Sequence, residues 1–133
     1  VSNVDEEIIE RYKKRAEMDD AVAIYNLGCC YADGTHGKTQ DIFNALIFWH
    51  RAGELGCAKS NHNIGCGYDN GEGVERDIEK AKHYYELAAI GGNIYSRYNL
   101  GDLEEDADNM SRSLKHHMIA VGCGGNESLN RIR

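Results

Sequence analysis

The side chains best suited to chemistry in this 133-residue chain are a histidine and a cysteine at helical spacing. His62 and Cys66 lie four residues apart, which places both on one face of a helix, and Cys57 is near in sequence. Imidazole and thiolate groups bind zinc, but a zinc ion normally takes four ligands from two converging elements. No second pair in the chain has ligand spacing, so we expect no metal site.

The densest charge cluster holds five acidic residues: Asp102, Glu104, Glu105, Asp106 and Asp108. A calcium loop that begins at Asp102 would need glycine at its sixth position and glutamate at its twelfth, but Ala107 and Ser113 stand there. The cluster is therefore predicted to be a solvated helix end and turn. The alternative is a surface that attracts a basic segment of a partner.

Motifs of covalent and phosphate chemistry are missing from the sequence. It contains no S-x-x-K, G-x-S-x-G or H-E-x-x-H motif and no P-loop, so we expect a protein that is not an enzyme and needs no cofactor. The formal charge of −7 disfavours nucleic acid and anionic lipid as partners, and no apolar run approaches the length that inserts into a bilayer. The five cysteines form no C-x-x-C pair, which favours free thiols and an intracellular, cytoplasmic location.

The chain repeats itself at intervals of 37 and 36 residues, measured from Gly28 to Gly65 and from Gly65 to Gly101. The aligned segments are YNLGCCYADG (25–34), HNIGCGYDNG (62–71) and YNLGDLEEDA (98–107). A period in this range, in a chain without proline, predicts a solenoid of helix pairs. Glycine inside a helix costs about 1 kcal/mol relative to alanine, so we expect each glycine to lie where the backbone of the partner helix nearly touches it.

The second helix of each repeat is predicted from an N-cap residue, a small residue four positions later and then a bulky pair. The caps are Asp41, Asp77 and Asn109, and the small residues are Ala45, Ala81 and Ser113. The bulky pairs are Phe48-Trp49, Tyr84-Tyr85 and His116-His117. In the turn before this helix, Gly71 and Gly73 are expected to have positive φ angles, and Val74 is expected to pack the turn against the core.

The pattern A-x-x-x-L-G-x-x-Y-x-x-G-x-G-V-x-x-D-x-x-K-A-x-x-W/Y-Y-x-x-A-A-x-x-G resembles Sel1-like repeats, which are related to tetratricopeptide repeats. The segment GEGVERDIEKAKHYYELAAIGG (71–92) follows it nearly throughout. The resemblance implies an all-α, right-handed superhelical solenoid of antiparallel helix pairs. Secreted, cysteine-rich relatives join these pairs by cysteines eight residues apart, where this chain has Gly53 with Asn61 and Ala89 with Arg97.

We expect one repeat array over residues 1–133. Residues 5–19 would be the second helix of a preceding unit, residues 20–56, 57–92 and 93–124 three repeats, and residues 125–133 the start of a following unit. The segments EEIIERYKKRAE, FWHRAGELG and LKHHMIAVG are similar to those of a group of protist Sel1-like proteins in which a zinc-binding RING finger precedes the repeats. Such a finger would lie outside this chain.

By resemblance to tetratricopeptide geometry, the first helices would line a concave face that binds a protein or peptide. The side chains on that face would be Tyr25, His62 and Tyr98; Asn26, Asn63 and Asn99; and Cys29, Cys66 and Asp102. The recurring asparagine either binds the main chain of a partner or braces neighbouring helices.

We therefore predict a non-catalytic adaptor, monomeric apart from end-to-end association of a truncated array. Two alternatives remain. One is the substrate-recruiting part of a RING-type ubiquitin ligase, and the other is a structural spacer without a specific ligand.

Overall fold

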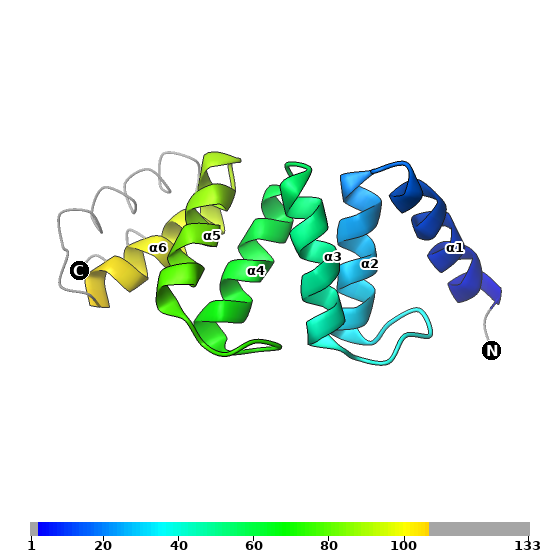
Figure 1. The fold of residues 1–133 in the computed structure, drawn as a ribbon, viewed down its shortest axis with the longest axis horizontal. Helices are drawn as coiled ribbons and strands as arrows, with labels where there is room; N and C mark the ends of the chain where they lie inside the picture. Colours follow the sequence, from blue (N-terminus) through cyan, green and yellow to red (C-terminus); the bar gives the residue numbers. More distant parts are fainter. Residues whose placement is uncertain (1–2, 107–133) are drawn as a thin grey trace.

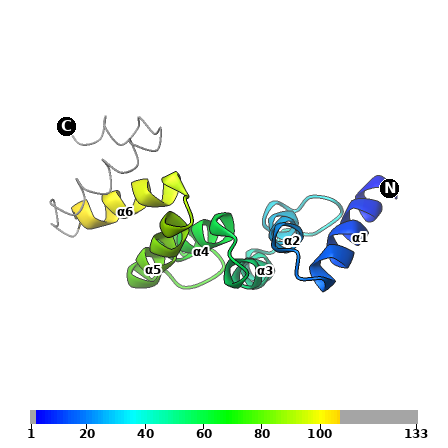
Figure 2. The ribbon, with the colours of Figure 1, turned by 90° about the horizontal axis from the view of Figure 1, so that it is seen from above.

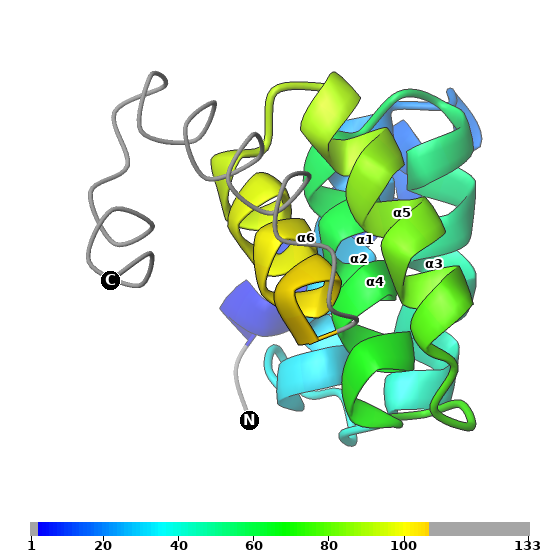
Figure 3. The ribbon, with the colours of Figure 1, turned by 90° about the vertical axis from the view of Figure 1, so that its left-hand side faces the viewer.

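The computed structural model describes residues 3–106, which form α-helices joined by short turns and by two longer loops, at residues 34–41 and 71–77. The helices are α1 (Asn3–Glu17), α2 (Ala21–Asp33), α3 (Ile42–Glu54), α4 (Ala58–Asn70), α5 (Ile78–Ile90) and α6 (Ile94–Asp106). Successive helices run antiparallel and lie side by side along the array (Figure 1). Seen from above, the array curves, with α2, α4 and α6 toward the inside and α3 and α5 toward the outside (Figure 2). The view along the array shows the same two rows (Figure 3).

Carboxylate caps begin the helices where the sequence predicts them. The Asp41 side chain accepts a hydrogen bond from the Asn44 amide at 3.1 Å, and the Asp77 side chain accepts one from the Lys80 amide at 3.1 Å. These bonds satisfy amides of the first turn that have no partner inside the helix. Asp20 caps α2 in the same way, which the repeat pattern did not single out.

The turn between α4 and α5 also has the predicted form. Gly71 and Gly73 have φ angles of +69° and +76°, in the left-handed region that favours glycine. Val74 is half-buried and packs against the cluster that contains Trp49. The turn is therefore held on the core by an apolar contact.

Gly28 and Gly65 lie at equivalent points of α2 and α4, and the nearest atoms beside each glycine belong to an aromatic ring of the facing helix. A Cβ on Gly28 would lie 2.5 Å from Nε1 of Trp49, and one on Gly65 would lie 2.6 Å from Cδ1 of Tyr85. The backbone of α3 also comes close to Gly28, because a Cβ there would lie 3.2 Å from the carbonyl oxygen of Ala45. The predicted close approach of two backbones therefore holds at Gly28, whereas at Gly65 the three nearest atoms all belong to the Tyr85 ring. Glycine leaves room for the second aromatic residue of the bulky pair on the facing helix.

Half-buried tyrosines link the hydrophobic core across the helix pairs. Tyr25 packs against the cluster formed by α1, α2 and α3 and also against the next cluster, around Trp49. Tyr68 packs against the cluster around Trp49 and against the one around Tyr85. Ala45 and Ala81 are fully buried in these clusters, as the small-residue positions predict. Each repeat is therefore stabilised by its neighbours, as in other solenoids.

The acidic cluster differs from its prediction at one residue. Glu104 is only 2 % exposed because it follows the fully buried Leu100 by four positions on α6 and so shares its inward face. The reading of the whole cluster as a solvated helix end is therefore wrong for Glu104. Asp102 and Glu105 are half-buried on the same helix.

Several predictions for the third repeat fall on residues outside the described range. They concern Asp108, Asn109, Ser113, His116, His117 and the unit predicted at residues 125–133. Gly101 is buried in α6, but the helix predicted to face it also lies outside that range. Within residues 3–106, no helix is both long and apolar enough to span a bilayer.

Candidate binding cleft

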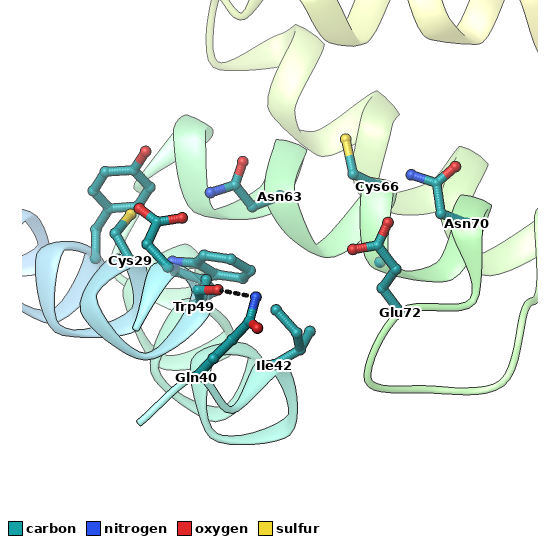
Figure 4. Close-up of a pocket in the computed structure, with 12 residues that line it drawn as sticks. Cys29, Gln40, Ile42, Trp49, Asn63, Cys66, Asn70 and Glu72 are labelled. Carbon is teal, nitrogen blue, oxygen red and sulfur yellow. Dashed lines mark hydrogen bonds between the residues drawn. The ribbon is translucent and has the colours of Figure 1, made fainter. Parts of the chain in front are cut away.

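A cleft of about 480 Å³ opens between α2 and α4, with the start of α3 and Trp49 at its base (Figure 4). Its lining residues come from α2, α3, α4 and the loops at one end of these helices. They are Tyr25, Cys29, Ala32, Asp33, Gln40, Ile42, Trp49, Asn63, Cys66, Gly67, Asn70 and Glu72. A cavity of this size is in the range that takes a small ligand or a few side chains of a peptide.

Trp49 forms the apolar base of the cleft. It is 7 % exposed, and its indole Nε1 lies against α2 at Gly28. Burial raises the pKa of the Cys29 thiol beside it, although the hydroxyl of Tyr25 and the indole N–H of Trp49 act in the opposite direction. The thiol of Cys29 is therefore neutral at pH 7.

Tyr25 and Asn63 face each other across the cleft, one from α2 and one from α4. Burial and the neighbouring Cys29 raise the pKa of Tyr25 to about 12, while its interaction with the Asn63 side chain lowers it. Asn63 lines the cleft and lies close to Tyr25 of the neighbouring helix, so both roles considered for the recurring asparagine are compatible with this position.

His62 lies on a different side of α4 and faces α6. Its Nδ1 is 2.8 Å from Oγ of Ser96, and its Nε2 is 3.5 Å from Sγ of Cys66. Burial lowers the pKa of His62, which keeps the imidazole neutral at pH 7. Burial also raises the pKa of the Cys66 thiol, whose Sγ lies 3.6 Å from the Tyr85 hydroxyl.

The contact between His62 and Cys66 confirms that the two side chains share a helix face. Within residues 3–106, no three side chains of the metal-binding types come together as a ligand group. Both side chains are neutral, and the pKa of the Cys66 thiol is raised. A cysteine nucleophile is activated by a lowered thiol pKa, so this pair lacks that activation.

The structure brings some of the predicted groove residues together and places others elsewhere. Those that line the cleft are Tyr25, Cys29, Asn63 and Cys66. Those that do not line it are Asn26, His62, Tyr98, Asn99 and Asp102. The sequence reasoning missed the acids at the mouth, Asp33 and Glu72, because it considered only recurring positions of the first helices. Their positions in the sequence could have indicated them, because Asp33 directly precedes Gly34 at the end of α2 and Glu72 directly follows Gly71 at the end of α4.

Comparison with known families settles the class of this chain. A family model described as Sel1 repeat matches residues 21–57 and 58–93. The chain belongs to the Sel1 repeat family. Repeats of this kind generally mediate interactions between proteins.

The chain is also similar to part of a plant protein. It is 30 % identical over 103 residues to the ERAD-associated E3 ubiquitin-protein ligase component HRD3B of Arabidopsis thaliana. The matched region covers 77 % of this chain and 16 % of HRD3B. The chain thus spans about one sixth of the length of that relative.

Solved structures confirm the all-α solenoid. A Sel1 repeat protein from Oxalobacter formigenes matches with a TM-score of 0.83 and 27 % identity, over 92 % of this chain and 51 % of that one. The protein c5321, described as a protective antigen of uropathogenic Escherichia coli strains, matches with a TM-score of 0.83 and 30 % identity, over 90 % of this chain and 26 % of that one. The cysteine rich protein B of Helicobacter pylori shares the fold with a TM-score of 0.72 at 19 % identity, over 95 % of this chain and 92 % of that one.

Proposed function

We propose that this chain is a non-catalytic binding module that takes a peptide segment of another protein into the cleft between α2 and α4. The observation that carries this proposal is that Cys29 and Cys66, which hold equivalent positions of two successive repeats, line the same cleft. A repeat array that lines one cleft with equivalent positions can bind an extended segment along its length.

The chemistry of the cleft suits binding better than catalysis. Trp49 and Ile42 supply an apolar base, while the side-chain amides of Gln40, Asn63 and Asn70 can donate to and accept from a peptide main chain. Such amides recognise a backbone without demanding one sequence. The neutral thiols of Cys29 and Cys66, which line the cleft, supply no activated nucleophile.

A blocking substitution tests this proposal. Asn70 is exposed at the end of α4 and lines the cleft, so Asn70→Trp should fill the cleft without disturbing the core. Lys59→Trp is the matched control because Lys59 is exposed on the first turn of the same helix and does not line the cleft. Peptides would be selected from a random display library on the full chain and their affinities measured by fluorescence anisotropy.

The expected result is that selected peptides bind the Lys59→Trp variant as well as the unchanged chain and bind the Asn70→Trp variant at least about tenfold more weakly. Selection of no peptide, or equal binding to both variants, would reject the cleft as the binding site. Failure to select any peptide would favour the structural spacer.

A second candidate function is substrate recruitment in a ubiquitin ligase assembly. The similarity to HRD3B favours it, because that relative is a component of such a ligase. The test is to purify the full-length protein from its own cells and add ubiquitin, an E1 and an E2 enzyme. Ubiquitin chain formation that is lost after chelation of zinc would support a RING finger, and no chain formation would reject this function.

The proposed module acts as a monomer in the cytoplasm. Sedimentation of the full-length protein and fractionation of its cells test these two points. A dimer, or recovery of the protein in the membrane or organelle fraction, would contradict them.

A further inference from the structure

We infer that the cleft between α2 and α4 selects peptide segments that carry a lysine or arginine, and that the cation of this side chain binds between Asp33 and Glu72. This inference rests on the proposed function, and it adds the chemical class of the partner. In this inference the two carboxylates at the mouth of the cleft determine which peptides bind.

The charges that line the cleft have one sign. Among its lining residues, Asp33 and Glu72 are acidic and none is basic. Both carboxylates affect a thiol that lines the cleft. Burial is the largest cause of the raised pKa of Cys29 and of Cys66. The negative charge of Asp33 also raises the pKa of Cys29, and that of Glu72 also raises the pKa of Cys66. A cation bound between the two carboxylates would be attracted by both.

Two basic residues near this end of the array, Arg76 and Lys38, have other partners. Nε of Arg76 donates to the main-chain carbonyl of Asp69 at 2.8 Å. The Lys38 ammonium lies over the Tyr31 ring, 5.6 Å from its centroid. The carboxylates at the mouth form no ion pair with either of these two side chains.

Helix dipoles do not provide this negative potential. α2 and α4 end at the mouth of the cleft, where their partial charges are negative, but α3 begins there with a partial positive charge. These contributions oppose one another. The side-chain carboxylates of Asp33 and Glu72 are therefore the main source of the negative potential.

The base of the cleft suits the rest of a long basic side chain. Ile42 and the indole of Trp49 offer apolar surface to the methylene groups (Figure 4). Asp33 and Glu72 are exposed, so the charged end can stay in water at the mouth. Lysine and arginine commonly bind in this way, with a buried stem and a solvated head. An acidic or short side chain would lack one or both of these interactions.

The experiment uses three peptide display libraries that are identical except for a central lysine, glutamine or glutamate. They are selected on the full chain, on Asn70→Trp, on the double variant Asp33→Asn with Glu72→Gln, and on a matched control. The control is Glu7→Gln with Glu54→Gln, which changes the net charge equally at exposed acids of α1 and α3 outside the cleft. Circular dichroism and a melting curve check that every variant is folded.

We expect the lysine library to be enriched about tenfold over the glutamine library on the full chain and on the control, and this preference to disappear on the Asp33/Glu72 variant. The preference should also shrink as the salt is raised from about 0.1 M to about 1 M.

Two results overturn the inference but leave the proposed function standing. One is binding that depends on Asn70 but shows no preference for lysine, and the other is a lysine preference that survives in the Asp33/Glu72 variant. Binding that the Asn70→Trp variant does not weaken overturns the proposed function as well. A dimer of the full chain that Asn70→Trp dissociates would identify a second copy as the occupant and also overturn the inference.

Discussion

Replacing Gly65 by alanine tests the physical reason for glycine in the interior of α4. In an exposed helix the change would stabilise the protein, because alanine favours helix by about 1 kcal/mol. In this array it should destabilise, because the new Cβ would lie 2.6 and 2.7 Å from two ring atoms of Tyr85. These distances are about 1 Å shorter than an ordinary contact between carbon atoms.

The ring of Tyr85 has little freedom to move away. It is 1 % exposed, and its hydroxyl donates a hydrogen bond to Oδ2 of Asp69 at 3.0 Å. Overpacking a tight core costs about 1–3 kcal/mol, and loss of this hydrogen bond costs about 1 kcal/mol more. After the helix-propensity gain of about 1 kcal/mol, the expected net loss in the free energy of unfolding is about 2 kcal/mol.

Urea unfolding followed by circular dichroism measures this loss, and a double-mutant cycle identifies its cause. In a Tyr85→Leu background the ring is absent, so the Gly65→Ala change should become neutral or stabilising. The fluorescence of Trp49, the single tryptophan of the chain, reports separately on the neighbouring interface. A stabilising effect of Gly65→Ala alone, or the same cost in both backgrounds, would refute the steric argument.

Three further tests address a helix cap, a buried imidazole and a close approach between repeats. Asp77→Ala should lower the free energy of unfolding by about 1 kcal/mol in urea titrations, while Asp77→Asn should keep most of it, because either side chain oxygen can cap α5. Burial lowers the pKa of His62 in the folded chain, so on acidification the unfolded chain binds a proton at this histidine at a higher pH than the folded chain does. The free energy of unfolding should therefore decline as the pH falls below about 6.5. His62→Gln should reduce the slope of this decline, and an unchanged slope would contradict the burial of a neutral His62. The double variant Gly53→Cys with Asn61→Cys should form a disulfide on oxidation, because a Cβ on Gly53 would contact the Asn61 side chain. Peptide mass mapping would identify the bond, and the free energy of unfolding should rise by about 2–3 kcal/mol.

Local chemistry explains why the helix boundaries could be predicted from the sequence. The caps Asp41 and Asp77 bind amides only three residues away, and Gly71 ends α4 through its own φ angle. None of these features depends on distant parts of the chain. The repeat spacing then fixes which helices pair, because each unit is too small to bury its apolar face alone.

The place of the cleft along the array explains why part of its lining could not be predicted. Tyr25 and His62 hold equivalent positions in the repeat, and each faces the first helix of the next unit, but only Tyr25 lines the cleft because the cleft lies between α2 and α4. The pattern groups equivalent positions of all repeats but does not give the pair of helices between which a cleft opens. A similar limit applies to Gly28 and Gly65, whose close approach to the facing helix was predicted without the rings of Trp49 and Tyr85 that supply its shortest distances.

The residues that build the array and those that give the cleft its charge are different, and this separation supports the functional proposals. Gly28, Gly65 and the aromatic rings that face them are tightly packed, so changes there should alter stability before they alter binding. Asp33 and Glu72 are exposed at the mouth of the cleft, beside the glycines that end α2 and α4, and changes there should alter binding without altering the fold. An array of this kind can therefore acquire a new partner by substitution at its turn-proximal residues while its packed helices stay unchanged.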